Sequence, residues 1–485
     1  MFLLIATLVV TLVLLFLLWR RGWKVIYRIL GTLLILFVTR TWLVHGMHMR
    51  LELDGSGMMP MVKWGTKEAH FEELEKSRVA PPAAPVVEAP VAAAAPVEAP
   101  KPKLSTYWTD FRGPGKAGVY SQMPIITDWP AAGLKQLWKQ PIGGGYASFV
   151  IAEGRAITIE QRRAKEAVVA YDLLTGRELW VHAYDANFQE AMGGDGPRAT
   201  PVWYEGLVYS QGAAGDLLVL DAATGALKWS KNILEDNAAH NLQWGMSNTP
   251  LIVDDKVIVT PGGAGGKSIV AYNRLTGAAA WRVLDDKAAY TSPMLVTLAG
   301  KRQILAVTGT RVVGLEPETG AMQWEFPWKT EYDVNSALPL IVDDTHFFIS
   351  AGYGHGAALV EVSANAAKSV WQNTKMKNKF NHSVLYNGYI YGFDDSILAC
   401  INAKTGDLKW KGGRYGFGQL LLAGGYLVVI SEKGELVLIK ASPDGLQEVS
   451  KFAAIDGKTW NSPAISDGYL LVRNTTEMAC YRIGK

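Results

Sequence analysis

The chain has 485 residues, and 49% of them are hydrophobic, so it can bury a large core. Its 48 basic and 45 acidic residues leave a formal net charge of +3. This near balance, with no basic block in the long C-terminal part of the chain, gives no support for nucleic acid as a partner.

Two apolar runs near the N-terminus predict a membrane anchor over residues 1–50, made of one or two transmembrane helices. Phe2–Leu18 carries no charge and is close to the length that a membrane helix needs. No basic residue precedes this run, so it lacks the start of a cleaved signal peptide. The second run, Ile29–Val38, extends to Val44 and is interrupted by Arg40.

The charges between the two runs predict the topology. Four positive charges lie in the segment from Arg20 to Arg28, and the positive-inside rule places such a loop in the cytoplasm. Both ends of a two-helix anchor then lie outside, together with the rest of the chain. The second run as a single span gives the same result, whereas the first run alone would leave the main domain in the cytosol. We therefore expect an inner (cytoplasmic) membrane protein whose main domain lies in the periplasm.

Composition changes abruptly after the anchor. Residues 51–78 carry a short, charged helical pattern, and residues 79–103 consist almost entirely of Ala, Pro, Val and Glu. Such a segment cannot bury a core, and its prolines keep it extended. We expect a Pro/Ala-rich stalk that reaches about 75 Å, at about 3 Å per residue. The stalk marks the boundary to a domain over residues 104–485.

One frame repeats through this last domain. An Asp-type residue opens a turn, a Gly follows four residues later with a positive φ, and a Trp follows after four more. The copies are Asp172/Gly176/Trp180, Asp221/Gly225/Trp229, Asn273/Gly277/Trp281, Glu316/Gly320/Trp324 and Asn402/Gly406/Trp410, with degraded copies at Ser363/Ala367/Trp371 and Ala441/Gly445/Val449. A period of roughly 40–50 residues predicts a propeller or solenoid of short strands.

Hairpin turns fix the number of blades. Each repeat contains a two-residue turn between apolar runs, which is typical of a β-hairpin. Eight such turns occur, at residues 153–154, 205–206, 254–255, 299–300, 343–344, 387–388, 424–425 and 467–468. The eighth repeat ends at Lys485 before its Trp strand, and an extra strand, Leu134–Pro141, surrounds Trp138. We predict that this strand closes the ring, which hides the edge strands. The expected fold is an all-β, eight-bladed β-propeller of four-stranded blades.

The Asp-x-x-Thr-Gly-x-x-x-Trp repeats and the opening Phe111-Arg-Gly-Pro114 together resemble the PQQ-like (quinoprotein-type) β-propeller repeat family, over about residues 104–485. This family includes quinoprotein dehydrogenases, which bind pyrroloquinoline quinone and calcium. It also includes the outer-membrane protein assembly propeller of Gram-negative bacteria, a non-enzymatic scaffold. The resemblance implies the fold and leaves the function open.

Site chemistry of the dehydrogenase type is hard to assign. Many alcohol-type members carry a vicinal cysteine pair, but Cys400 and Cys480 fall at equivalent positions in blades six and eight, too far apart for a disulfide. We expect two buried free thiols. No cluster of Glu, Asn and Asp could be matched to a calcium site or a catalytic base, so no catalytic residue and no metal site is assigned.

The loops that join each fourth strand to the next blade carry aromatic and small polar residues. They form the candidate face for a ligand or partner, with the residues Tyr146, Arg198, Trp244, Asn248, Tyr290, Tyr332, Asn335, His382, Phe417, Gln419, Trp460 and Asn461. The competing interpretation, which we prefer, is that these residues cap the strands and satisfy backbone groups.

We therefore expect a membrane-anchored, non-catalytic scaffold that binds a protein partner of the cell envelope and needs no cofactor. Two alternatives use the same loops. One is a dehydrogenase that depends on pyrroloquinoline quinone (PQQ) and calcium, and the other is a periplasmic sensor of a small ligand.

Overall fold

The computed structural model describes residues 2–53, 60–63, 65–78 and 104–485. The chain separates into two compact units, Met1–Glu73 and Leu74–Lys485. The stalk predicted over residues 79–103 lies outside the described residues.

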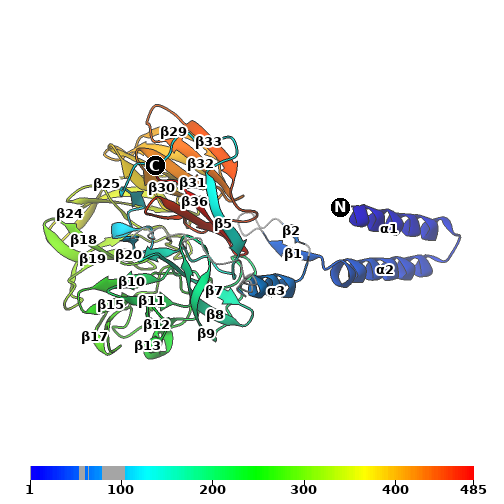
Figure 1. Cartoon of the computed structure of the whole chain (residues 1–485), viewed down its shortest axis with the longest axis horizontal. Helices are drawn as coiled ribbons and strands as arrows, with labels where there is room; N and C mark the ends of the chain where they lie inside the picture. The colour runs from blue at the N-terminus through cyan, green and yellow to red at the C-terminus, as the bar shows by residue number, and fades with distance from the viewer. Residues whose placement is uncertain (1, 54–59, 64, 79–103) are drawn as a thin grey trace, which may run out of the picture. The chain divides into compact units, whose positions relative to one another are not determined.

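The first unit contains a helical hairpin. Helix α1 (Phe2–Arg20) packs antiparallel to α2 (Val25–Thr41), which continues into the one-turn π-helix η1 (Trp42–Gly46) (Figure 1). Two hydrogen bonds join the helices: Thr11 Oγ1 lies 2.9 Å from Thr39 Oγ1, and the Trp19 indole Nε1 donates to Thr32 Oγ1 at 3.0 Å. Residues Val25–Gly46 are long and apolar enough to cross a membrane, whereas the apolar stretch of the first helix is shorter. Strands β1 (Arg50–Leu53) and β2 (Pro60–Lys63) form a two-stranded sheet, and helix α3 (Lys67–Arg78) follows.

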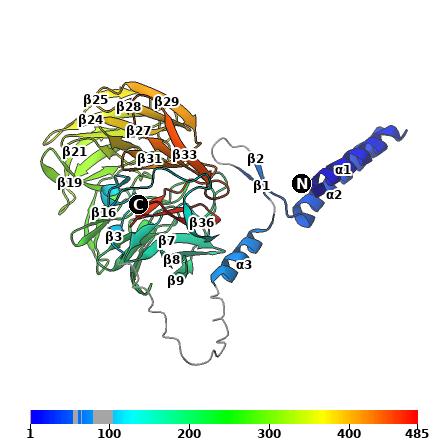
Figure 2. The same ribbon diagram turned by 45° about the horizontal axis from the view of Figure 1, so that its top comes forward.

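The second unit is the predicted eight-bladed propeller, with the blades following one another around a common centre (Figure 2). Each blade is built on four antiparallel strands in sequence order. The first four blades are β6 (Val150–Ala152), β7 (Arg155–Arg162), β8 (Lys165–Asp172) and β9 (Glu178–Asp185); β10 (Val202–Tyr204), β11 (Leu207–Gln211), β12 (Asp216–Asp221) and β13 (Leu227–Asn232); β14 (Leu251–Val253), β15 (Lys256–Val259), β16 (Ile269–Asn273) and β17 (Ala279–Val283); and β18 (Met294–Leu298), β19 (Lys301–Val307), β20 (Arg311–Leu315) and β21 (Met322–Pro327).

The last four blades have the same order, except that an N-terminal strand completes the eighth. They are β22 (Leu340–Ile341), β23 (His346–Ala351), β24 (Gly356–Val362) and β25 (Ala367–Asn373); β26 (Val384–Tyr386), β27 (Tyr389–Asp394), β28 (Ile397–Asn402) and β29 (Leu408–Arg414); β30 (Gln419–Ala423), β31 (Tyr426–Ile430), β32 (Glu435–Lys440) and β33 (Gln447–Ala453); and β34 (Ala464–Ser466), β35 (Tyr469–Arg473), β36 (Glu477–Arg482) and β5 (Lys135–Pro141). One short helix, α4 (Ile233–Asp236), follows β13, and Asn232 caps its N-terminus.

The predicted closure of the ring is confirmed. Strand β5, cyan in Figure 1, pairs antiparallel with the red strand β36, and Trp138 lies opposite Cys480. The Trp138 indole Nε1 also donates to the Leu173 carbonyl of blade 1, at 3.0 Å. The cysteines Cys400 and Cys480 are buried free thiols, as expected.

The repeated frame holds neighbouring blades together. The Trp180 indole Nε1 donates to the Ala222 carbonyl in the turn of the next blade, at 3.0 Å. In that turn Gly225 has a φ of 73°, and a Cβ built on it would lie 2.5 Å from the Trp180 ring. Only glycine therefore allows both this backbone conformation and the close approach of the ring. The same kind of hydrogen bond runs to the next blade from Trp138, Trp229, Trp281, Trp371 and Trp410.

The Asp-type residue of the frame shapes the turn itself. Asp221 Oδ1 accepts hydrogen bonds from the amides of Ala223 and Thr224, both at 3.1 Å. Such side-chain acceptance stabilises a tight turn. Between the blades the core is made of the apolar faces of adjacent sheets, which pack pairwise around the ring.

The start of the propeller domain fills the central channel, which the repeat pattern did not predict. Strand β3 (Thr106–Trp108) extends blade 1 beside β6, and β4 (Val119–Tyr120) extends blade 7 in parallel with β30. The 3-10 turn η2 (Pro114–Lys116), between these strands, contacts β18 of blade 4. The first strands of neighbouring blades contact one another and so surround the axis. Residues 106–120 therefore lie inside the ring, and we call them the channel plug.

Buried side chains hold the channel plug in place. Trp108 is fully buried, and the buried Arg112 guanidinium donates to the carbonyls of Leu420, at 2.9 Å, and Ser383, at 3.3 Å. A Cβ on Gly118 would lie 2.1 Å from that guanidinium. The plug thus ties blades 6 and 7 together from within.

Candidate functional site

The candidate residues lie in the loops between each fourth strand and the next first strand. We call this ring of loops the mouth, at residues 146–148, 197–200, 244–248, 290–292, 332–336, 380–382, 415–419 and 460–462. The structure divides the predicted residues into a buried polar group and a partly exposed aromatic group.

The amide side chains of the mouth are buried and bind their neighbours. Asn248, Asn335, Gln419 and Asn461 are only 1–2% exposed. Asn461 Nδ2 donates to the carbonyls of Ala147, at 2.9 Å, and Gly145, at 3.2 Å, in the next loop of the ring. Gln419 Nε2 donates to the Phe380 carbonyl at 3.1 Å. These amides therefore fasten one loop to another.

The two remaining amides, Asn335 and Asn248, also form hydrogen bonds with neighbouring residues. Asn335 Nδ2 donates to the Thr308 carbonyl at 3.0 Å. Asn248 accepts a hydrogen bond from Gln211 Nε2 at 2.5 Å and donates to Thr260. The nitrogens of both amides thus donate to the protein, while Asn335 Oδ1 is buried without a hydrogen-bond partner among the described residues.

His382 faces the channel plug. Its Nδ1 accepts a hydrogen bond from the Leu338 amide at 3.0 Å, and its ring meets Phe111 edge to face, with 5.2 Å between centroids. Burial holds the pKa of His382 well below its usual value, and the charge of Arg112 lowers it further. A neutral, buried imidazole is thus part of the packing beneath the mouth.

Aromatic rings form a continuous chain along one side of the mouth. Tyr146 and Trp460 have centroids 5.5 Å apart, and Trp460 and Phe380 are 4.6 Å apart. Phe380 in turn lies 5.5 Å from Phe417. Phe380 and Trp460 come from loops two blades apart, so the rings reach across the loop between them.

The other side carries two further aromatic pairs. Trp244 lies 5.6 Å from Tyr290, and Tyr332 lies 5.8 Å from Tyr353. Tyr332 is 63% exposed and Tyr353 is 39% exposed. The predicted aromatic residues are thus brought together in pairs and chains, and part of their surface is open to solvent.

Two lysines lie over these rings. Lys379 Nζ is 4.4 Å from the Phe417 centroid and 5.1 Å from that of Tyr353. Lys458 Nζ is 4.1 Å from the Trp460 centroid. Ammonium groups in these positions interact favourably with the ring faces.

Arg198 is held more tightly than the lysines. Its guanidinium lies 4.6 Å from the Phe188 centroid and 5.5 Å from that of Tyr146, and Nη2 donates to the Gly194 carbonyl at 2.6 Å. Burial lowers the pKa of Arg198, although Tyr146 and nearby carboxylates act in the opposite sense. Arg198 thus presents a fixed cation between two rings.

The twelve predicted residues of the mouth include no carboxylate that could hold calcium beside a quinone. Calcium takes six to eight oxygen ligands, with carboxylates among them. Within the described part of the chain, no group of three or more His, Cys, Asp or Glu side chains is placed to hold a metal ion. Glu432, which contacts the mouth, accepts hydrogen bonds from Trp460 Nε1 at 2.8 Å and from the Phe417 amide at 3.4 Å. No reaction step is therefore assigned to this site.

Tyr353, Phe188 and Lys458 were missed in the sequence, whereas Phe380 belongs to a predicted loop and Lys379 stands beside it, although neither was named among the candidate residues. Lys379, Phe380, Lys458, Tyr353 and Phe188 all contact predicted residues. The available signal was a lysine one or two positions before an aromatic residue of the loop, as in Lys379-Phe380 and Lys458-Thr-Trp460. Nothing in the sequence indicated that Phe111 and His382 would meet.

Comparison with known proteins gives the family. The family model described as outer membrane protein assembly factor BamB matches residues 115–243 and 164–412. The chain is 29% identical over 174 residues to quinohemoprotein alcohol dehydrogenase ADH-IIG of Pseudomonas putida, which covers 34% of this chain and 23% of that protein. It is 25% identical over 205 residues to BamB of Bordetella pertussis, which covers 40% of this chain and 46% of that protein. The chain therefore matches less than half of the length of each of these curated relatives.

Solved structures share the fold at low identity. BamB of Moraxella catarrhalis superposes with a TM-score of 0.50 and 16% identity, covering 72% of this chain and 97% of that one. Quinohemoprotein alcohol dehydrogenase of Comamonas testosteroni superposes with a TM-score of 0.59 and 13% identity, covering 78% of this chain and 81% of that one. The family model extends over more than half of the chain, so the chain belongs to the PQQ-like β-propeller family of outer membrane protein assembly factor BamB.

Proposed function

We propose that this chain is a membrane-anchored scaffold whose propeller binds a protein partner of the cell envelope through the mouth. The match to BamB, named as an outer membrane protein assembly factor, supports a role in the envelope. The helical hairpin supports attachment to a membrane, since Val25–Gly46 is long and apolar enough to cross one. The four positive charges from Arg20 to Arg28 favour a cytoplasmic hairpin loop, and hence an inner-membrane anchor with the propeller in the periplasm.

The single observation that carries this proposal is the contrast between amides and aromatic rings at the mouth. The amides that could orient a small ligand are 1–2% exposed, and their nitrogens donate to protein carbonyls, whereas the side-chain oxygens of Asn335, Gln419 and Asn461 have no hydrogen-bond partner among the described residues. The partly open groups are Tyr332, Tyr353 and their neighbours, with Lys379 over the rings. Aromatic residues are enriched at the centres of protein interfaces, because rigid rings bury much area at little entropic cost.

A second candidate function is suggested by the relative named quinohemoprotein alcohol dehydrogenase. That function would require PQQ and calcium at the mouth, where none of the twelve predicted residues is a carboxylate. A ligand at 100 times its dissociation constant stabilises a fold by about 2.7 kcal/mol, which a thermal shift detects. We expect no shift with PQQ and calcium, and a clear upward shift would favour the dehydrogenase. If the protein is a small-ligand sensor, its own ligand should raise the melting temperature. Unlike a dehydrogenase, the sensor should not reduce an electron-accepting dye.

The scaffold is tested by affinity capture of the tagged, full-length protein from solubilised membranes. The variant Tyr332→Ala/Lys379→Gln changes two groups at the mouth, one of them 63% exposed, so it should fold normally. The matched control Leu275→Ala/Lys404→Gln changes exposed residues in turns of blades 3 and 6. We expect one partner to be lost with the mouth variant and kept with the control. Equal capture by both variants would exclude the mouth as the binding face.

A further inference from the structure

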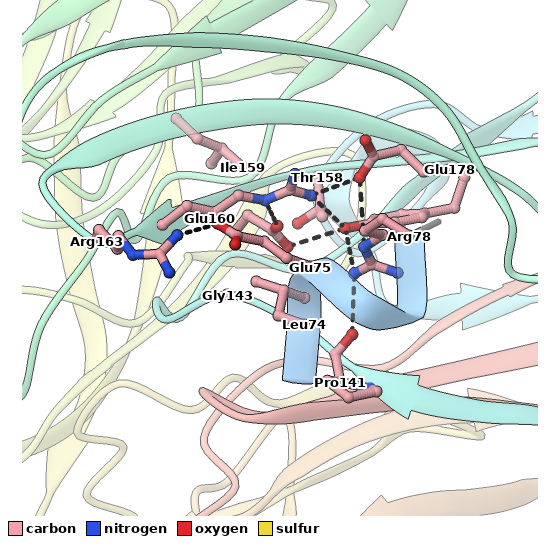
Figure 3. A network of polar contacts seen from close by, with 12 residues as sticks. Leu74, Glu75, Arg78, Pro141, Gly143, Thr158, Ile159, Glu160, Arg163 and Glu178 are labelled. Carbon is pink, nitrogen blue, oxygen red and sulfur yellow. Dashed lines mark hydrogen bonds and ion pairs between the residues drawn. The ribbon is translucent and has the colours of Figure 1, made fainter. Parts of the chain in front are cut away.

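Two side chains of the last turn of helix α3 are buried in the propeller unit. Leu74 is 1% exposed, and the side chain of Arg78 is 10% exposed. The Arg78 guanidinium lies 4.7 Å from the Tyr171 ring centroid, and its Nη2 donates to the Tyr171 hydroxyl at 3.0 Å. It also donates to the Pro141 carbonyl at 2.9 Å and pairs with Glu178 at 3.4 Å (Figure 3). A charged helix that reads as solvent-exposed in the sequence thus ends in a specific contact.

Arg78 joins a network of buried and partly buried charged groups. Glu160 is fully buried and pairs with Arg162, while Tyr171 donates to Glu160 at 3.1 Å. Arg162 reaches Glu178 at 2.7 Å, so two carboxylates and two guanidinium groups surround the Tyr171 hydroxyl. A buried charge is tolerated only with such partners, and loss of one partner leaves the others uncompensated.

The position of this network is the junction where the ring closes. Pro141 ends β5, the N-terminal strand that completes blade 8, whereas Tyr171 and Glu178 lie on β8 and β9 of blade 1. Arg78 therefore bonds to both sides of the junction. Arg473, at the end of β35 in blade 8, crosses it as well, by donating to Thr158 of blade 1 at 2.8 Å.

A second, more exposed ion pair also holds the end of helix α3. Glu75 pairs with Arg163, in the turn after β7, and both residues belong to the propeller unit (Figure 3). Together, Leu74 supplies an apolar contact, Glu75 a surface ion pair and Arg78 a buried one. Arg78 is four residues after Leu74 and three after Glu75, so the three side chains lie on one side of the helix.

We propose that Leu74–Arg78 is a clasp that holds the closure of the propeller. Leu104, on the other side of residues 79–103, packs against the same core region of blades 7, 8 and 1.

Thiol cross-linking in the full-length, detergent-solubilised protein tests the contact. A short bismaleimide should join the cysteines of Glu75→Cys/Arg163→Cys, because the side chains of these positions meet. The control pair Glu68→Cys/Arg163→Cys places one thiol about 10 Å further along the helix, at 1.5 Å per residue. Cys400 and Cys480 are buried and do not compete for the reagent. Cross-linking of the control as fast as the test pair would overturn the proposal.

Thermal unfolding tests whether the clasp stabilises the closure. Arg78→Met keeps the length of the side chain and removes its charge, and we expect a Tm lower by about 3–6 °C. Lys76→Met is the matched control, since Lys76 is exposed on the same helix, and its Tm should be unchanged. The loss should shrink when Glu178→Gln is already present, because the two residues share one interaction. Equal Tm values for Arg78→Met and Lys76→Met would contradict the clasp even if the cross-link forms.

Discussion

Replacing Gly225 by Ala should show why each repeat needs its glycine. The added Cβ would lie 2.5 Å from the Trp180 ring, which cannot easily retreat because its indole is bonded to Ala222. A left-handed φ of 73° costs an L-residue about 1–2 kcal/mol, and overpacking adds about 1–3 kcal/mol. The expected loss in the free energy of unfolding is therefore about 2–5 kcal/mol.

Gly206 in the same blade provides the control. Its φ is 75°, but a Cβ there would meet nothing within 4 Å. Gly206→Ala should therefore cost only the conformational part, about 1–2 kcal/mol. Thermal unfolding of both full-length variants, followed by tryptophan fluorescence, gives the comparison. Trp180→Leu should cost less in the Gly225→Ala background than alone, because the smaller side chain relieves the contact. Equal losses for Gly225→Ala and Gly206→Ala would refute the role assigned to the tryptophan.

Three further outcomes follow from the structure. Deletion of Lys135–Pro141 should leave β36 as an open edge and cause aggregation or a large drop in Tm, and a monomer with unchanged Tm would contradict the closure. A phosphatase fused after Lys103 should be active if the propeller is periplasmic, whereas an inactive fusion with an active cytoplasmic reporter would place it in the cytosol. Burial alone would raise the pKa of Glu160, but Arg162, Arg78 and Arg473 outweigh burial and lower it. The stability from Glu160 is thus present above the unfolded pKa and lost as pH falls through the folded one, so Glu160→Gln should flatten the decline of Tm below about pH 4.5.

The blades could be predicted because their determinants are local and periodic. Asp221, Gly225 and Trp229 lie within one turn and the strand after it, so their spacing survives in the sequence. The closure could be inferred because the strand around Trp138 had no preceding strands in its own repeat, while the last repeat, which contains Cys480, lacked its Trp strand.

The channel plug and the clasp could not be predicted, because their contacts join distant segments. Strands β3 and β4 have only three and two residues, which is too short for a recognisable pattern. Arg112 reaches Leu420 across 308 positions, and Arg78 reaches Tyr171 across 93. A single arginine in a charged helix gives no sign of the partner it will find.

The candidate site was predictable in part. Aromatic residues at the starts of the blades indicated a shared face, and Tyr146, Trp460 and Phe417 do belong to one chain of rings. Whether an amide such as Asn461 faces a ligand or a carbonyl depends on the neighbouring loop, which comes from the far end of the sequence.

Site-specific photo-cross-linking in living cells tests the proposed scaffold most directly. A photoreactive amino acid at Tyr332, on the mouth, is compared with one at Val449, which is 47% exposed on the last strand of blade 7. We predict one discrete adduct with an envelope protein from position 332 and none from position 449. No adduct from position 332, or the same adduct from both positions, would contradict partner binding at the mouth.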